Sequence, residues 1–201
     1  DLLTFTPSAN LNGSGAASFK FNVIDSGTVP LASPVANTFS FDISAVNDAP
    51  VASGTATLAS ITEDTANPAG ATVSSLFAAT FSDAADAVTG GSVANTLAGI
   101  AISSYTADAS KGVWQYSSNG STWTALNSVS SVATSIALKA TDLLRFVPAA
   151  NFNGSAPALS AKLIDSSSAA FNTGASVDAT GGGSTAYSST RSEEHTSELQ
   201  S

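Results

Sequence analysis

The acidic side chains are the residues of this sequence whose type and spacing could do chemistry. Residues 1–190 contain twelve of them, and eleven of the twelve are Asp. Asp favours turns and calcium-binding loops over helices. Calcium takes about six to eight hard oxygen ligands, which carboxylates, Asn side chains and backbone carbonyls supply together. Groups of Asp and Asn that meet at the ends of strands are therefore candidate calcium sites.

Sequence patterns of common enzymes are missing. The single His lies at position 195 and there is no Cys, so residues 1–190 cannot form a Ser-His-Asp or Cys-His arrangement. The HExxH, P-loop and GxSxG patterns do not occur either. Asp83 and Asp86 are close enough in sequence to form a carboxylate pair, but no feature places them in a cleft for glycoside chemistry. We therefore predict that the protein is not an enzyme.

Charge and hydropathy argue against two further classes of partner. In residues 1–190, 12 acidic side chains stand against 5 Lys and Arg, which gives −7. Such a charge repels nucleic acid and anionic membranes and attracts cations. No apolar run approaches the roughly 20 residues that cross a bilayer. We expect neither nucleic-acid binding nor membrane insertion.

An internal repeat organises the chain. The segment "DLLTFTPSANLNGS" at 1–14 returns as "DLLRFVPAANFNGS" at 142–155, with ten of the fourteen positions identical. One residue is then lost, and "SFKFNVIDS" at 18–26 returns as "LSAKLIDS" at 159–166 at an offset of 140. A period of about 141 residues is long for a solenoid and suits a series of whole domains.

The domain boundaries follow from this repeat. We predict the C-terminal part of one repeat at 1–46, a linker at 47–50, and a second repeat at 51–190 that lacks its last strand. The repeats are thus expected to be truncated at both ends. Each would need the missing strands of its own copy to close its core.

Period-two patterns predict the secondary structure. Residues 18–23 and 39–45 alternate between apolar and polar side chains, as half-buried strands with one wet face do. Asn-Gly tolerates the positive φ of tight turns, and Pro and Ser-rich clusters mark further turns. The predicted fold class is all-β, a sandwich of the immunoglobulin or cadherin-like kind. The three Asn-Gly-Ser segments, at 12–14, 119–121 and 153–155, are expected to form such turns.

Three aromatic residues offer a second kind of site. In "GVWQYSSNGSTWTAL" at 112–126, a two-residue turn at Asn119-Gly120 would place Tyr116 opposite Trp123, with Trp114 on the same side. An exposed face of this kind would bind a carbohydrate or a protein ligand, whereas a buried one would fill a core. The burial of these side chains discriminates between the two hypotheses.

Several motifs resemble one known group of proteins. "AVNDAPV" at 45–51 resembles the linker between cadherin-like tandem repeats of very large bacterial surface and secreted proteins. "ITEDT" at 61–65, "VSSLFAATFSDAAD" at 73–86, "GVWQYSSNGSTW" and "LRFVPAANFNGS" resemble the same group, so the resemblance covers residues 1–190. It implies immunoglobulin-like sandwiches in tandem, an extracellular or cell-surface location, and calcium in the linkers.

Strand direction assigns the acids to two ends of the second repeat. Loops between antiparallel strands alternate between the ends of a sandwich, so the linker and every second turn share one end. Solvated turn residues are the alternative interpretation of the same Asp residues. The predicted upper calcium site consists of Asp25, Asn47, Asp48, Asp83 and Asp86. The predicted lower, incomplete site consists of Glu63, Asp64 and Asp165.

The last eleven residues, "RSEEHTSELQS", differ from the rest of the chain. They hold three of its four Glu and its only His. They intervene where the second repeat should begin a strand like "TFSFDISAV", and they resemble the translation of a DNA adapter that is ligated to fragments for sequencing. We predict that Arg191–Ser201 is a non-native tail that does not pack on the core, which leaves a strand edge of the second repeat unpaired. His195 would then be neither a ligand nor a base.

These observations favour a structural and adhesive repeat module of a giant bacterial exoprotein. It would act as a spacer and display stalk, with calcium in the linkers as the expected cofactor. Its expected partners are the neighbouring repeats of the same chain and a host-surface, matrix or cell-surface glycan or protein. The alternative is a β-sandwich that binds a carbohydrate or protein ligand through Trp114, Tyr116 and Trp123.

Overall fold

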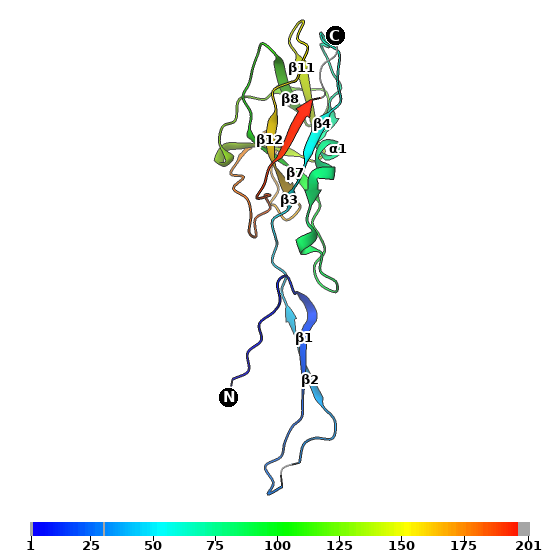
Figure 1. The fold of residues 1–201 in the computed structure, drawn as a ribbon, viewed down its shortest axis with the longest axis vertical. Coiled ribbons are helices and arrows are strands. Elements are labelled where there is room, and N and C mark those ends of the chain that lie inside the picture. The colour runs from blue at the N-terminus through cyan, green and yellow to red at the C-terminus, as the bar shows by residue number, and fades with distance from the viewer. Residues whose placement is uncertain (1, 30, 197–201) are drawn as a thin grey trace. The chain divides into compact units, whose positions relative to one another are not determined.

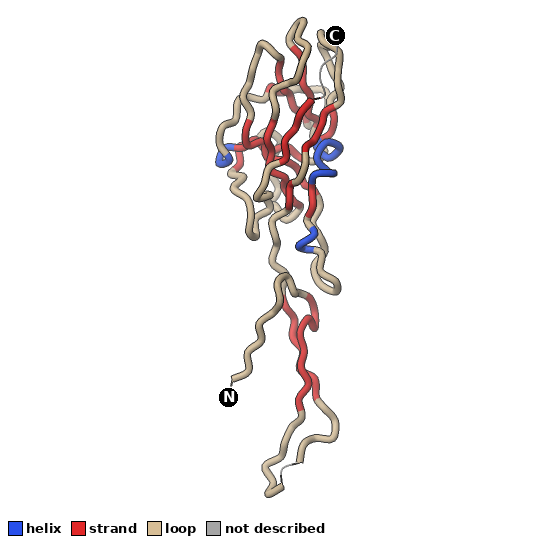
Figure 2. The backbone as a smooth tube through the Cα atoms, in the orientation of Figure 1, coloured by secondary structure: helices blue, strands red, loops and turns tan. Residues whose placement is uncertain are grey.

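The computed structural model describes residues 2–29 and 31–196. The protein is all-β: strands dominate the described part of the chain, whose one α-helix, α1 (Val73–Phe77), has five residues (Figure 2). Two compact units divide the chain. Unit 1 consists of Asp1–Val46 and Ala84–Ala94, and unit 2 consists of Asn47–Asp83 and Asn95–Ser201. The division after Val46 falls at the start of the predicted linker, but the loop Ala84–Ala94 joins unit 1.

Unit 1 is built on a hairpin. β1 (Gly13–Phe21) pairs antiparallel with β2 (Asn37–Ile43), and the register places Phe19 opposite Phe39 (Figure 1, blue strands). A bulge between Gly13 and Ala17 shifts the register at the base of the hairpin. The alternating sequence forms these strands as predicted, and it puts the Phe side chains on one face.

Unit 2 contains two larger sheets. All strand pairs are antiparallel except the parallel pair of β14 with β4. The first sheet has the order β13 (Ser176–Val177), β10 (Ser135–Lys139), β7 (Leu97–Ser104), β12 (Leu159–Asp165), β14 (Ser192–Thr196) and β4 (Thr55–Leu58). The second has the order β5 (Ala71–Thr72), β11 (Leu143–Pro148), β8 (Gly112–Ser117) and β9 (Thr124–Ala125), and β3 (Val51–Ala52) pairs with β6 (Phe81–Ser82).

One apolar core lies between these two sheets. Trp114 and Phe146 of the second sheet are fully buried, with ring centroids 5.4 Å apart. Ile100 and Leu163 of the first sheet belong to the same cluster. The indole of Trp114 donates to the carbonyl of Pro157 at 2.8 Å, so its one polar atom is satisfied inside the core.

A short helix packs against this core. Thr72 caps α1, since its hydroxyl accepts a hydrogen bond from the Ser75 amide at 3.1 Å. Val73 and Phe77, four residues apart, lie on one face of the helix and are fully buried. Three 3-10 helices occur in the described loops: Ala78–Thr80, Ala84–Asp86 and Val132–Thr134.

The C-terminal segment is part of the first sheet. β14 pairs antiparallel with β12 and parallel with β4, and it lies between them in Figure 1 (red). The prediction that this segment does not pack and leaves the edge of β12 unpaired is therefore wrong up to Thr196, while residues 197–201 lie outside the described part. The physical reason is that the edge of β12 pairs with backbone N–H and C=O groups, and any extended segment can supply these groups whatever its side chains are.

The register of β14 repeats that of β2. At the offset of 140, Phe19 corresponds to Leu159; Phe19 pairs with Phe39, and Leu159 pairs with Glu194. Glu194 therefore occupies the position that Phe39 has in the first repeat. β14 fills the place that was predicted for the closing strand, but with a carboxyl group directed at the core.

The environment of Glu194 is unfavourable for a charge. Its side chain is fully buried, and Oε1 accepts a hydrogen bond from the Leu58 amide at 3.1 Å, while Oε2 has no hydrogen-bond partner among the described residues. Burial raises the pKa of Glu194 from 4.5 to about 8. β4 contributes no ionisable side chain, and Lys162 of β12 donates to the Ser189 carbonyl instead.

This burial makes the stability of unit 2 depend on pH. Between pH 4.5 and about 8 the folded state holds a proton on Glu194 that the unfolded state releases, so the free energy of unfolding falls as pH rises across this range. Each pKa unit of displacement corresponds to about 1.4 kcal/mol. Urea unfolding at several pH values measures the slope. Glu194→Gln should remove its part of the slope, and Glu193→Gln, the control, should keep it; equal slopes in both variants would contradict the prediction.

Candidate functional site

Two predicted ligands of the upper site, Asn47 and Asp83, meet at one end of unit 2 through Asn95. The Asn47 amide donates to the Asp48 carbonyl at 3.1 Å, to the Thr185 carbonyl at 3.4 Å and to Asp165 Oδ2 at 3.5 Å. Asp83 Oδ2 accepts from the backbone of Asn95 at 2.5 Å. We call Asn47, Asp83, Asn95 and Asp165 the linker-end cluster. All of its side chains offer oxygen atoms.

Asn95 connects this cluster and was not predicted. Its side-chain amide donates to Asn47 Oδ1 at 2.9 Å, and its carbonyl oxygen accepts from Ser166 Oγ at 3.1 Å. Asn95 lies just before β7, where the strand leaves the linker end. The sequence signal was weak, because Asn is common in turns and no acidic residue accompanies it in "VANTL".

Asp165 lies at the opposite end from the one predicted. It ends β12, opposite Leu97 at the start of β7, and it is fully buried. Its Oδ1 accepts from the Ser167 amide at 2.8 Å and from the Ser167 hydroxyl at 2.5 Å. The lower-site assignment of Asp165 is therefore wrong. Asp165 was placed at the lower end as the counterpart of Asp25, which was expected at the base of the first repeat, whereas its side chain lies beside Asn47 at the linker end.

The other two residues of the predicted lower site are Asp64 and Glu63, and Asp64 stabilises a turn. Asp64 adopts a positive φ of 59° and its Oδ1 accepts from the Asn151 amide at 2.8 Å. Asp64 thus holds the turn that follows β11, at the other end of unit 2 from Asp165. Glu63 is half-buried beside it. These two residues share no site with Asp165.

Asp25 and Asp86 belong to unit 1 and lie far apart within it. Asp25 Oδ1 accepts from the Gly27 and Leu31 amides at 3.0 and 3.3 Å, in the turn beyond Phe21. Asp86 lies in the loop that meets the other end of the hairpin, near Gly13. A strand the length of β1 spans roughly 25 Å at 3.3 Å per residue. The predicted grouping of Asp25 with Asp86 is wrong.

The acidic side chains of the described residues do not gather into large groups that could bind a metal ion. Within residues 2–29 and 31–196, no group of three or more His, Cys, Asp or Glu side chains is placed to hold a metal ion. The linker-end cluster combines two carboxylates with two Asn side chains and nearby carbonyls. This donor set fits calcium in kind, since every donor is an oxygen, but it carries less charge than a site built from several carboxylates.

The three aromatic residues do not form one exposed face. Trp114 is fully buried, and Tyr116, two residues on, packs against the same core. Tyr116 pairs with Thr124, so the predicted pairing with Trp123 is wrong. The turn is longer than two residues because Asn119 Oδ1 accepts from the Ser121 and Thr122 amides and draws residues 118–123 into the loop.

Trp123 lies on the outer face of the second sheet, under a cation. The Arg145 guanidinium lies 3.8 Å from the centroid of the Trp123 ring. Arg145 Nε donates to Gln115 Oε1 at 2.9 Å and Nη1 donates to Asn67 Oδ1 at 2.6 Å. A ring covered by a guanidinium is stabilised by the cation–π interaction and does not offer that face to a sugar.

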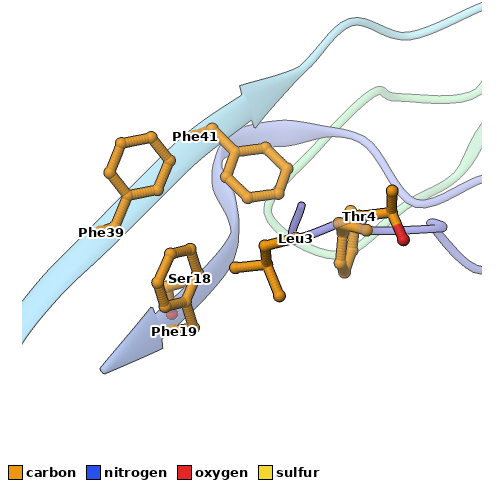
Figure 3. Close-up of a pocket in the computed structure, with 7 residues that line it drawn as sticks. Leu3, Thr4, Ser18, Phe19, Phe39 and Phe41 are labelled. Atoms are coloured by element: carbon orange, nitrogen blue, oxygen red, sulfur yellow. The ribbon is translucent and has the colours of Figure 1, made fainter. Parts of the chain in front are cut away.

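Unit 1 carries an apolar groove on its hairpin. The groove has a volume of about 530 Å³, and Figure 3 shows Phe39 and Phe41 on β2 with Leu3 and Phe19 across from them. The rings of Phe5 and Phe41 meet edge to face at 5.1 Å, and those of Phe19 and Phe39 are 5.4 Å apart. Five of the seven lining residues are apolar, Thr4 and Ser18 are the other two, and no charged side chain lines the groove, so it suits an apolar occupant.

The groove corresponds to a covered face in unit 2. Phe19 is 40% exposed, whereas its counterpart Leu159 is 1% exposed. Val23 is 58% exposed, whereas its counterpart Leu163 is 0% exposed. The same strand is thus solvent-exposed in one repeat and part of a closed core in the other.

Comparisons with known proteins give no match: no family model matches the sequence, and neither a curated protein nor a solved structure does. None of the helices in the described part of the chain is long and apolar enough to cross a bilayer.

The two tryptophans should differ in their contribution to stability. Trp114→Ala removes a fully buried ring and is expected to lower the free energy of unfolding by about 3–5 kcal/mol. Trp123→Ala removes a half-buried ring and its cation–π contact with the buried Arg145, and should cost about 2 kcal/mol. Urea unfolding measures both. Equal losses would contradict the assignment of the two rings to opposite faces of the second sheet.

Proposed function

We propose that this chain is a structural repeat module of a large bacterial surface or secreted protein, and that it acts as a spacer and display stalk outside the cell. Its repeats are cadherin-like or immunoglobulin-like sandwiches joined in tandem. The observation that carries the proposal is the exposed core face of unit 1, whose counterpart in unit 2 is closed by that unit's own strands. A chain made of such repeats closes each core in turn.

The register of the two hairpins supports this proposal. β2 on β1 and β14 on β12 pair at equivalent positions, although the sequences of β2 and β14 are unrelated. The first repeat therefore supplies the pattern of a native closing strand, with Phe39 where β14 has Glu194. The ligand-binding alternative is not carried further, because Trp114 is buried and Trp123 lies beneath Arg145.

Completion of the first repeat tests the proposal. Residues 47–141 placed directly before residue 1 join Thr141 to Asp1, as Thr141 joins Asp142 in the second repeat. The added segment should cover the groove, so the fluorescence of a dye that binds apolar surfaces should fall and the amides of β1 and β2 should exchange at least about tenfold more slowly.

A matched control uses the same extension with Trp114→Ala in the added segment. Loss of that ring should weaken the new core and return much of the dye binding. If the unaltered extension leaves dye binding and amide exchange in β1 and β2 as they are in the original chain, the groove is not the core face of a repeat and the proposal fails.

Calcium at the linker-end cluster is the second part of the proposal. Asp83 and Asp165 would supply carboxylate oxygens, Asn47 and Asn95 would supply amide oxygens, and the Asp48 carbonyl lies beside Asn47. With two carboxylates, the affinity is expected in the range of weak extracellular sites, about 10⁻⁴–10⁻³ M. The bound ion would stiffen the start of the repeat.

Calcium should therefore stabilise unit 2 measurably. At a concentration ten times the Kd, binding adds roughly 1.4 kcal/mol to the free energy of unfolding. Thermal melts in calcium and in chelator measure this gain. Asp83→Asn and Asp165→Asn should reduce it, while Asp64→Asn, at the other end of unit 2, should keep it. Identical melts of the original chain in calcium and in chelator would show that the cluster is held by its own hydrogen bonds alone.

A further inference from the structure

The loop Ala84–Ala94 is held in unit 1 by two asparagines, chiefly by Asn12. Asn12 Oδ1 accepts from the Ser92 amide at 2.7 Å, and Asn12 Nδ2 donates to the Ser92 hydroxyl at 3.0 Å. The Ser92 hydroxyl in turn donates to the Asp86 carbonyl at 2.7 Å. Asn10 adds a bond from its amide to the Ala85 carbonyl at 3.3 Å. The Asn12 side chain uses both its donor and its acceptor on this loop.

Two glycines make the approach possible. A Cβ on Gly91 would collide with the Asn12 side chain and carbonyl. A Cβ on Gly13 would lie 2.5 Å from the Gly90 carbonyl oxygen, and Gly13 has a φ of 122°. Thr89-Gly90-Gly91-Ser92 therefore fits against Asn12 as a backbone surface, with no side chain between them.

The turn that carries Asn12 recurs at the far end of unit 2. Asn10, Asn12 and Gly13 correspond to Asn151, Asn153 and Gly154 in the repeated segment. The φ values agree, at 60° and 58° for the first pair of Asn residues and at 122° and 125° for the two glycines. Asp64 braces the second turn through the Asn151 amide. The backbone of the binding turn is thus formed in both copies.

The two copies differ in what covers them. Asn12 is 8% exposed beneath the loop, whereas Asn153 is exposed. We propose that Asn153 is a docking residue, and that its partner is the Thr89–Ser92 loop of a further copy of the same repeat. The inference rests on the proposed tandem arrangement and names the surface through which one repeat holds the next.

The chemistry of this surface specifies its partner. An Asn amide recognises one N–H and one hydroxyl at the same time, which matches the Ser92 backbone and side chain. The close approach of Gly91 to the Asn side chain excludes loops with a Cβ at that position. A copy of this repeat provides both features, and the interaction needs no charged group or metal ion.

A tandem chain tests the proposal. It consists of residues 1–190 followed by residues 36–201, so that residues 37–43 enter the closing position in the register of β2 and a second copy of the loop follows the first Asn153. The side-chain amide protons of Asn12 and Asn153 are observed by NMR in the original and tandem chains, with each signal identified by its loss in the Asn→Ala variant.

In the original chain, Asn12 should exchange slowly with solvent and Asn153 rapidly. In the tandem chain, the first Asn153 should slow at least about tenfold, and the last Asn153 should remain fast as an internal control. Ser92→Ala in the added copy should reverse the slowing at the first Asn153. Ser92→Ala in the first copy should instead affect Asn12 only.

The proposal is overturned if the first Asn153 stays at the solvent rate in the tandem chain, or if its slowing survives Ser92→Ala in the added copy. Hydrogen exchange of the backbone amides in β12 and in the new closing strand tests the tandem arrangement separately. Slow exchange there with a fast first Asn153 rejects the docking surface alone, while fast exchange there rejects the proposed tandem closure.

Discussion

The fold of unit 2 depends on closure of the gap between β12 and β4. An open strand edge beside a core leaves backbone N–H and C=O groups without partners, and β7 satisfies only one edge of β12. Ser192–Thr196 satisfies the other edge and pairs with β4 as well. The backbone thus fixes the position of the closing strand, while its side chains decide how stable the closed sheet is. The backbone of Glu194 pairs as the closing strand requires. Its side chain destabilises the closed sheet, because the carboxyl group lies in the core.

This separation of backbone and side chain explains what the sequence could predict. Period-two alternation predicted β1 and β2, and the internal repeat predicted where a closing strand belongs. The pairing of β14 could not be predicted from composition, because Glu and Ser are poor strand residues but pair through the same backbone groups as any other residue. The fold class followed from alternation, and the partner of each edge required the structure.

The candidate site shows the same limit at a finer level. Asn47 and Asp83 were predicted to share one end of unit 2, and Asn95 links them there. Asp165 was assigned to the wrong end because it was placed as the counterpart of Asp25, and no pattern in the repeated segment shows which end of the sandwich that turn occupies. Trp114 and Tyr116 were correctly predicted to lie on one face of their strand, but alternation alone does not say whether that face is covered.

The loop Ala84–Ala94 changes how the repeats are understood to be joined. It leaves unit 2 after Asp83, returns before Asn95, and folds as part of unit 1. The contacts that hold it are made by amides, a hydroxyl and two glycines, which are neutral groups, so salt screens them little. Calcium at the linker-end cluster would therefore add to an attachment that exists without it. In the proposed stalk, such contacts would keep their order when calcium is scarce, and the ion would adjust the stiffness of the repeat instead of deciding whether the loop is held.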